Sequence, residues 1–171
     1  MGPASRILPL SIQIGILRHA IAEDQAPSQK DFDRRITPLG RQRLDLQIER
    51  LISWGWAPSA LFHSPFVRTT QTAAVVAARF PGLQVVASDA IALGDLSEIL
   101  RLCVGHESPL LVGHEPTMGE LVAHLLGAPR GTTPMKKAGF ALLDVNRLPT
   151  TRPARLMLFA PPPAARLGGV E

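Results

Sequence analysis

Hydrophobic and polar positions follow two alternating patterns along the chain. Short apolar runs, typical of buried strands, occur at residues 12–17, 60–63, 83–87, 110–112, 140–145 and 156–159. Between these runs, apolar residues recur every three or four positions, which is typical of amphipathic helices. The clearest such pattern runs from Met118 to Leu126. The chain is therefore predicted to alternate strands with helices.

Local signals mark where several of these helices begin and end. A capping residue followed by proline predicts a helix start, because the side chain accepts a hydrogen bond from a free N–H and proline fits the first turn. A glycine after the last apolar position predicts a helix end. These signals are Thr37-Pro38, Ser64-Pro65, the Asp95/Glu98 pair, and the closing glycines Gly55 and Gly127.

Strand–helix alternation predicts an α/β fold, a mostly parallel sheet with helices on both faces. We expect a single domain over residues 1–171, because no repeat and no linker divides the chain. A tail from about residue 161 is rich in proline and glycine and is expected to be loose. In such folds ligands bind beyond the carboxyl ends of the strands, and functional residues are expected there.

Composition narrows the function classes. The hydrophobic share of 46% and charged share of 19% are ordinary for a soluble globule, and the net charge of +4 is spread without a cluster. Nucleic-acid and membrane partners are therefore not expected. Most basic residues are arginine, which suits planar recognition of phosphate or carboxylate. The lone Cys103 excludes an internal disulfide, and the chain shows neither a signal-peptide pattern nor a membrane-spanning run, so a cytoplasmic location is expected.

Candidate chemistry lies at the predicted strand ends. Arg18 and His19 follow the first strand, Arg68 lies in the first turn of a predicted helix, and His114 lies where a strand passes into a helix. Arg34 precedes the cap Thr37 by three residues. An arginine at a helix N-terminus opposes the helix dipole, which is understandable if an external anion binds there. Each residue alone also has a structural interpretation: a surface cation, a hydrogen-bonded histidine, a solvated loop charge or a packing residue.

The motifs together resemble those of a known family. The segments LRHAIAED, RRITPLG, HSPFVRTTQTA and LLVGHEPTM are similar, in this order, to the motifs of the histidine phosphatase superfamily. The short length and the segment MKKAGFALLDV resemble the SixA-type phosphohistidine phosphatases. The resemblance runs over about residues 12–145 and implies a minimal phosphoglycerate mutase-like fold.

The resemblance also implies roles for individual residues. His19 matches the nucleophile that accepts the phosphoryl group, and His114 matches the second histidine of the pocket. The arginines that hold phosphate oxygens would be Arg18, Arg34 and Arg68. The choice of Arg34 over Arg35 rests only on its spacing from Thr37.

Elementary chemistry agrees with these residue types. Only a neutral imidazole can attack phosphorus, and both burial and neighbouring arginines lower the pKa of a histidine. The same arginines would offset the charge of a phosphoryl group, so neither a metal nor another cofactor is expected. The spacing of His106, His114 and His124 matches no familiar zinc site, and His63 is expected to be a polar residue at a strand end.

The proton donor is not assigned by the sequence. Asp95 is better explained as a helix cap, which leaves Glu23, Asp24 and Glu115 as candidates. A phosphorus–nitrogen bond to imidazole needs less acid catalysis, since a protonated imidazole is a good leaving group. We therefore expect a phosphatase acting on phosphohistidine in a protein, with a histidine-containing phosphotransfer domain as one candidate partner. The alternatives are a hydrolase of a small phosphorylated metabolite and an inactive phosphate-binding adaptor.

Overall fold

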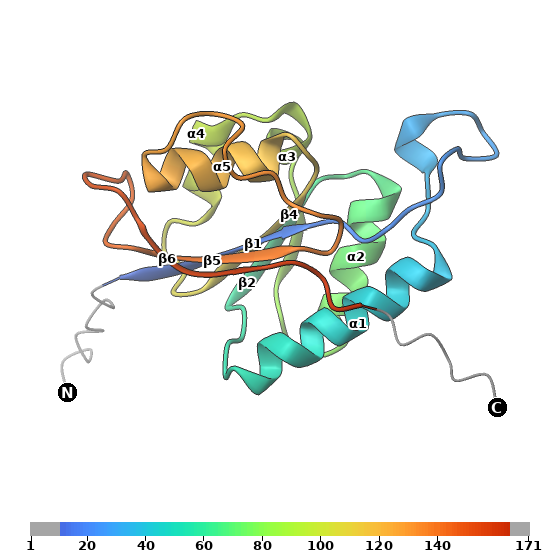
Figure 1. Ribbon diagram of the computed structural model, residues 1–171, viewed down its shortest axis with the longest axis horizontal. Coiled ribbons are helices and arrows are strands. Elements are labelled where there is room, and N and C mark those ends of the chain that lie inside the picture. Colours follow the sequence, from blue (N-terminus) through green and yellow to red (C-terminus); the bar gives the residue numbers. More distant parts are fainter. Residues whose placement is uncertain (1–10, 165–171) are drawn as a thin grey trace, which may run out of the picture.

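The computed structural model describes residues 11–164, and its centre is a six-stranded sheet (Figure 1). The strand order is β3-β2-β4-β1-β5-β6. The first four strands of this order pair in parallel, whereas β5 and β6 are antiparallel to their neighbours. The predicted α/β fold with a mostly parallel sheet is confirmed. The strands are β1 (Ile12–Arg18), β2 (Ala60–His63), β3 (Val85–Ala87), β4 (Pro109–Gly113), β5 (Phe140–Val145) and β6 (Arg155–Ala160).

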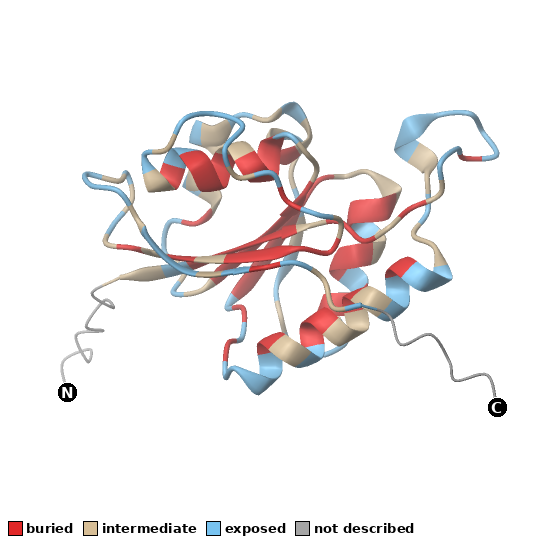
Figure 2. Cartoon of the chain, viewed as in Figure 1, coloured by how far each residue is buried: buried red, intermediate tan, exposed pale blue. Residues whose placement is uncertain are grey.

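Helices cover both faces of the sheet. In Figure 1, α3, α4 and α5 lie above the strands, while α1 and α2 lie below. Residues of alternate strand positions pack into two apolar cores, so that Ile16 faces one helical layer and Leu17 the other. Figure 2 shows the buried residues along the central strands and the facing sides of the helices. The helices are η1 (Asp31–Asp33, a 3-10 helix), α1 (Pro38–Ser53), α2 (Val67–Ala77), α3 (Asp89–Leu93), α4 (Leu96–Leu102) and α5 (Thr117–Leu126).

The register of the central strands brings their carboxyl ends to one edge. Arg18 pairs with Gly113, and His63 pairs with Val112. The N–H of His19 donates to the carbonyl of Gly113 at 2.9 Å, which extends the β1–β4 pairing by one residue. Residues that follow β1, β2 and β4 therefore meet at the same place.

The start of α1 lies against the segment that follows His19. Thr37 caps the helix, and its hydroxyl oxygen accepts a hydrogen bond from the N–H of Gly40 at 3.0 Å, as the sequence predicts. A Cβ atom on Gly40 would lie 2.1 Å from the carbonyl oxygen of Ile21. Glycine is thus required here by a close backbone approach, which fixes α1 beside the candidate site.

Two local predictions are wrong, and one short helix is not indicated by the sequence pattern. Ser64 does not cap a helix: its N–H still pairs with the carbonyl of Val112, so the backbone stays extended, and α2 begins only at Val67. The strand predicted over residues 83–87 starts at Val85, because Leu83 belongs to a turn closed by its N–H on Phe80. The helix α3 was not predicted; it has only five residues and ends at Gly94 in the left-handed conformation.

Candidate active site

His19 lies directly beyond β1 and is buried, with 4% of its surface exposed. Its Nδ1–H donates to the carbonyl oxygen of Ala20 at 2.7 Å, since a carbonyl can only accept. This bond leaves Nε2 as the ring nitrogen with the free lone pair. Burial, and after it the nearby His114, Arg68 and Arg18, lowers the pKa of His19 to about 3, although the bond to Ala20 opposes the shift. The ring is therefore neutral at physiological pH and can act as a nucleophile.

Arg18 is held by the segment that precedes β5. Its Nη1 donates to the carbonyl oxygen of Met135 at 2.6 Å. The N–H of Ala138 in turn donates to the carbonyls of both Arg18 and His19, at 3.1 and 3.0 Å. Burial lowers the pKa of Arg18, and Glu115 opposes that shift. The guanidinium is thus a fixed and partly desolvated cation beside the nucleophile.

Arg68 enters from the first turn of α2 and is nearly as buried as His19, with 7% exposed. Its Nη1 donates to the carbonyl of Asp31 at 2.7 Å, and its Nη2 forms an ion pair with the carboxylate of Asp31 at 3.0 Å. Its Cζ lies 4.9 Å from the centre of the Phe66 ring. These contacts orient Arg68 toward the edge where His19 lies, and its charge lowers the pKa of that histidine.

Arg34 joins the site through the same carboxylate. Its Nη1 pairs with the other oxygen of Asp31 at 2.7 Å, and its Nε–H donates to the carbonyl of Glu23. The hydrogen bond from Arg34, followed by that from Arg68, lowers the pKa of Asp31. Arg35 is instead exposed and lines a separate hollow with Glu23 and Asp33. The structure thus brings Arg34, and not Arg35, next to Arg68.

His114 lies against His19, with ring centres 5.3 Å apart. Its Nε2 is 2.8 Å from the hydroxyl of the fully buried Ser64. Burial, then Arg68, lowers the pKa of His114 to about 4, so this ring is neutral as well. The hydroxyl that the sequence suggests as a helix cap is therefore used to orient the second histidine.

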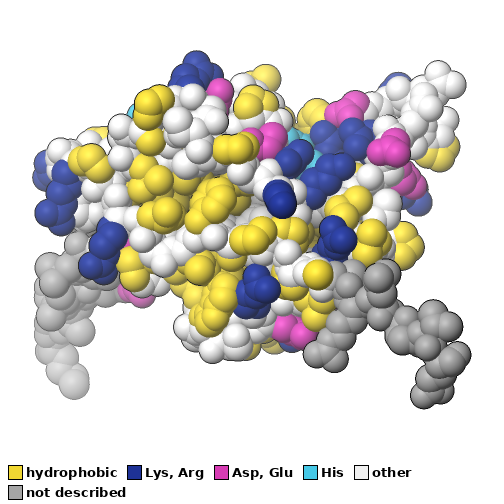
Figure 3. All heavy atoms as spheres, in the orientation of Figure 1, with side chains coloured by type: hydrophobic (Ala, Val, Ile, Leu, Met, Phe, Trp, Pro, Cys, Tyr) yellow, Lys and Arg dark blue, Asp and Glu magenta, His cyan; other side chains and the backbone are white. Residues whose placement is uncertain are grey.

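Three nitrogen atoms at this site are buried without a hydrogen-bond partner among the described residues. They are Nε of Arg18, Nε of Arg68 and Nδ1 of His114. Unpaired buried polar atoms are costly, and they are commonly satisfied by a ligand. Figure 3 shows histidine side chains at the surface, surrounded by Lys and Arg with Asp and Glu nearby. The arrangement can accept an oxyanion in front of His19.

The candidate proton donors occupy different surroundings. Glu115 is half-buried, its carboxylate accepts a hydrogen bond from the N–H of Gly119 at 2.9 Å, and burial raises its pKa. Glu23 accepts from the backbone N–H of Arg35, and Asp24 is exposed. Asp95 caps α4 by accepting from two backbone N–H groups, as expected. Burial thus favours the protonated form of the Glu115 carboxyl.

The remaining predicted polar residues have structural surroundings. His63 is buried, and its Nδ1 is hydrogen-bonded to the carbonyl of Ser64 at 2.8 Å. His106 packs on Phe62, and His124 is exposed on α5. Residues 11–164 contain no group of three or more histidine, cysteine or acidic side chains that could hold a metal ion. None of the helices described is long and apolar enough to cross a membrane.

Asp31 is the site residue that sequence reasoning missed. It is the exposed first residue of the short helix η1, where a charged residue gives no distinctive signal in the sequence. The only sequence sign is its position three residues before Arg34, a spacing at which side chains in a tight turn can meet. The sequence pattern indicates Ser64 as a helix cap, whereas its hydroxyl is hydrogen-bonded to His114.

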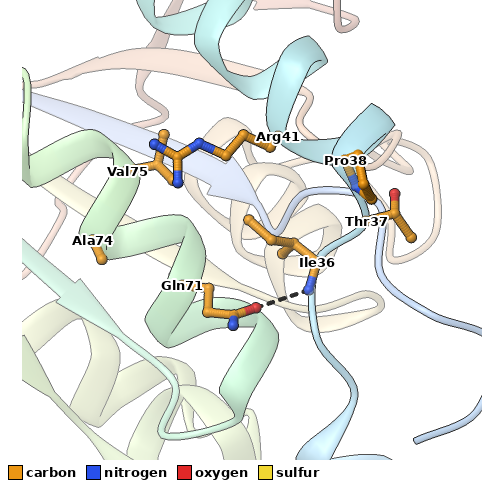
Figure 4. A pocket seen from close by; sticks show the side chains of 7 residues that line it. All are labelled: Ile36, Thr37, Pro38, Arg41, Gln71, Ala74 and Val75. Carbon is orange, nitrogen blue, oxygen red and sulfur yellow. Dashed lines mark hydrogen bonds between the residues drawn. The ribbon is translucent and has the colours of Figure 1, made fainter.

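Sizeable hollows lie beside the histidines rather than over them. One of about 590 Å³ is formed between the start of α1 and the middle of α2 (Figure 4). Gln71 lines it, and its side-chain oxygen accepts a hydrogen bond from the N–H of Ile36 at 2.8 Å. A second, of about 460 Å³, shares Gln71 and lies under the loop that carries η1. His19 lines neither of these two hollows.

Comparison with known proteins identifies relatives of this arrangement. A family model described as the histidine phosphatase superfamily, branch 1, matches residues 14–99. An uncharacterized protein of a Picosynechococcus species is 32% identical over 135 residues, which cover 75% of this chain and 82% of the relative.

Solved structures give the same result. The protein assigned as the phosphohistidine phosphatase SixA of Agrobacterium tumefaciens is 26% identical, with a TM-score of 0.74 over 88% of this chain and 98% of that one. A protein of Escherichia coli assigned as an alpha-ribazole-5'-P phosphatase shares the fold, with a TM-score of 0.67 and 16% identity over 94% of this chain and all of that one. The chain belongs to the histidine phosphatase superfamily, and its structural relatives include the SixA-type phosphohistidine phosphatases.

Proposed function

We propose that this protein is a metal-independent phosphatase that removes the phosphoryl group from phosphohistidine in a partner protein through a covalent intermediate on His19. The observation that carries the proposal is the neutral, buried His19 ring, whose Nδ1 is committed to Ala20 and whose site contains three unpaired nitrogen atoms. A phosphoryl group would supply oxygen acceptors for the two unpaired Nε–H groups. Its charge would be offset by the arginines, as phosphoryl transfer requires.

The reaction consists of two displacements at phosphorus. Nε2 of His19 attacks the phosphorus atom, the bond between phosphorus and the substrate's imidazole nitrogen breaks, and that nitrogen leaves with a proton. Water then attacks the phosphorus of phospho-His19, which releases inorganic phosphate and returns His19 to its neutral form. Arg18 and Arg68 balance the negative charge throughout, with Arg34 acting on the phosphate beside Arg68. His114, oriented by Ser64, lies against the attacking ring.

The protonation states of Asp31 and His114 favour a phosphorus–nitrogen bond over an alkyl ester, which leaves Glu115, whose pKa is raised by burial, as the candidate acid for an ester leaving group. The ion pairs with Arg34 and Arg68 keep Asp31 ionised, so this carboxylate is a poor proton donor at neutral pH. His114 is neutral as well. A substrate imidazole, with an ordinary pKa near neutrality, can take its proton from solvent, whereas an alkoxide leaving group depends on a positioned acid.

Phosphate trapping tests the covalent step. Wild-type protein is mixed with phosphohistidine protein, quenched in alkali and analysed by mass spectrometry. We expect an acid-labile phosphate on His19, which His19→Ala abolishes. His124→Ala is the matched control, since His124 lies exposed on α5, and it should label normally. Labelling that persists in His19→Ala would refute the covalent scheme.

A second candidate function is hydrolysis of a small phosphorylated metabolite. It is favoured by the fold shared with the protein assigned as an alpha-ribazole-5'-P phosphatase. A panel of phosphohistidine protein, sugar phosphates and nucleotide phosphates separates the two proposals. Rapid turnover confined to the small esters would replace the first proposal with the second, and tight phosphate binding without turnover or labelling would indicate an adaptor.

A further inference from the structure

Aromatic rings lead outward from the nucleophile. The ring centre of His114 lies 5.3 Å from that of His19, and Phe66 is 4.8 Å from His114 in an edge-on arrangement. Phe32 then lies 4.9 Å from Phe66. We call Phe66 and Phe32 the aromatic shelf. It begins at the neutral histidine pair and ends at the surface.

Phe32 is a partly exposed aromatic residue beside the site. It lies in the short helix η1 between Asp31 and Asp33, and 43% of its surface is exposed. Its ring packs on that of Phe66 on one side, and the rest of the ring surface remains in contact with water. The packing therefore leaves ring surface available next to the site.

Phe32 is held in place by the same groups that form the phosphate site. Its neighbour Asp31 forms ion pairs with both Arg34 and Arg68. Asp33 accepts a hydrogen bond from the hydroxyl of Ser28 at 2.7 Å, which closes the loop behind it. The ring of Phe32 is thus fixed relative to the guanidinium of Arg68 and does not hang freely from a loop.

Phe66 joins the shelf directly to that guanidinium. The Cζ of Arg68 lies 4.9 Å from the centre of the Phe66 ring. A phosphoryl group bound by Arg68 would therefore carry its substituent to within reach of the shelf. An in-line displacement sends the leaving group to the side of phosphorus opposite the attacking His19. Phe66 and the partly exposed Phe32 form the outer end of the row of rings that starts at His19.

We propose that Phe66 and Phe32 form a leaving-group subsite that selects substrates whose phosphorus is attached to a planar aromatic ring. This inference rests on the proposed phosphatase function and extends it, because the ring of phosphohistidine is such a substituent. Offset or edge-on contact with an aromatic face stabilises a bound ring beyond simple burial. Substrates with flexible alkyl or sugar substituents gain nothing comparable from the shelf.

Binding of two non-hydrolysable phosphonates tests the subsite without relying on turnover. In phenylphosphonate the ring is bonded directly to phosphorus, as in a phosphorylated imidazole, whereas methylphosphonate has no ring. Titration calorimetry on the full-length chain gives the affinity for each. We expect wild type to bind phenylphosphonate more tightly than methylphosphonate. Phe32→Ala should lower the affinity for phenylphosphonate alone, by about two- to tenfold. Phe66→Leu, which keeps an apolar side chain, should likewise lower the ratio of the two affinities.

Trp54→Ala provides the matched control. Trp54 is also an exposed aromatic residue, with 48% of its surface accessible and the Cζ of Arg50 lying 5.7 Å from its ring, but it lies at the far end of α1. The Trp54→Ala variant should leave the affinities for both phosphonates unchanged. The proposed subsite would be refuted if wild type bound both phosphonates with equal affinity. It would also be refuted if Phe32→Ala and Phe66→Leu lowered both affinities equally. Either result would leave the phosphatase proposal intact. Failure of both phosphonates to bind wild type would refute the phosphate site and the shelf together.

Discussion

The low pKa of His19 makes the stability of the protein depend on pH. In the unfolded chain this histidine takes up a proton near pH 6.5, whereas in the folded protein its pKa is about 3. Between these values the unfolded state binds more protons than the folded state, so the free energy of unfolding falls as the pH is lowered. This contribution is fully present above pH 6.5 and is lost progressively toward pH 3.

The magnitude follows from the two pKa values. Between pH 7 and pH 5 the unfolded histidine becomes almost fully charged while the folded one stays neutral, which costs about 2 kcal/mol of stability. Urea unfolding at the two pH values measures this loss in wild type and in His19→Gln. We expect the loss to be about 2 kcal/mol smaller in the variant. His114 contributes with the same sign in both proteins, so the difference isolates His19.

The comparison does not depend on how stable the variant is at pH 7, because only the change with pH is compared. His124→Gln removes an exposed imidazole from α5 and should retain the full wild-type loss. If His19→Gln loses as much stability as wild type between pH 7 and pH 5, the ring is not held neutral by burial. The nucleophile would then require another explanation.

Three further predictions concern the arginines and the close approach of α1. Arg68→Gln should lower kcat/KM by about 10²–10³, as loss of one preorganised donor does, whereas Arg35→Gln should change it less than about twofold; equal effects in a steady-state assay would contradict the assignment. Asp31→Asn removes the negative charge that pairs with the guanidinium groups of Arg34 and Arg68. Inorganic phosphate should then inhibit phosphatase activity up to about fivefold more strongly. Weaker inhibition would show that Asp31 does not compete with phosphate for these arginines. Gly40→Ala should lower the free energy of unfolding by about 2 kcal/mol or more, measured by urea unfolding, since its Cβ meets the backbone of Ile21; an unchanged value would show that α1 can shift.

Much of the fold could be predicted because the strands and long helices are locally consistent. β2 and β5 have the bounds that the apolar runs indicate. Thr37 caps α1 through its hydroxyl, and Gly127 ends α5 in the left-handed backbone conformation, as the sequence predicts. The start of α2 could not be predicted in the same way. The hydroxyl of Ser64 is bonded to His114, which lies 50 residues away in the chain, and a local capping rule does not include such a partner.

The site was predictable to the extent that it depends on topology. Arg18 and His19 follow β1 and His114 follows β4, and parallel pairing of these strands is enough to bring them together. The choice between Arg34 and Arg35 and the role of Asp31 depend instead on how one loop folds onto α2. Those contacts join the exposed carboxylate of Asp31 to two arginines, and the sequence pattern of residues 31–35 is the same as that of a solvated loop.

The backbone of His19 is hydrogen-bonded on both sides by segments distant in the chain. Its N–H donates to the carbonyl of Gly113, the last residue of the central strand β4, and its carbonyl accepts from the N–H of Ala138 before β5. The amide proton of the nucleophile should therefore exchange with solvent as slowly as those in the middle of the sheet. These two bonds align the attacking nitrogen through the backbone of the central sheet. His19 therefore loses its position only when the central strands separate, that is, on global unfolding.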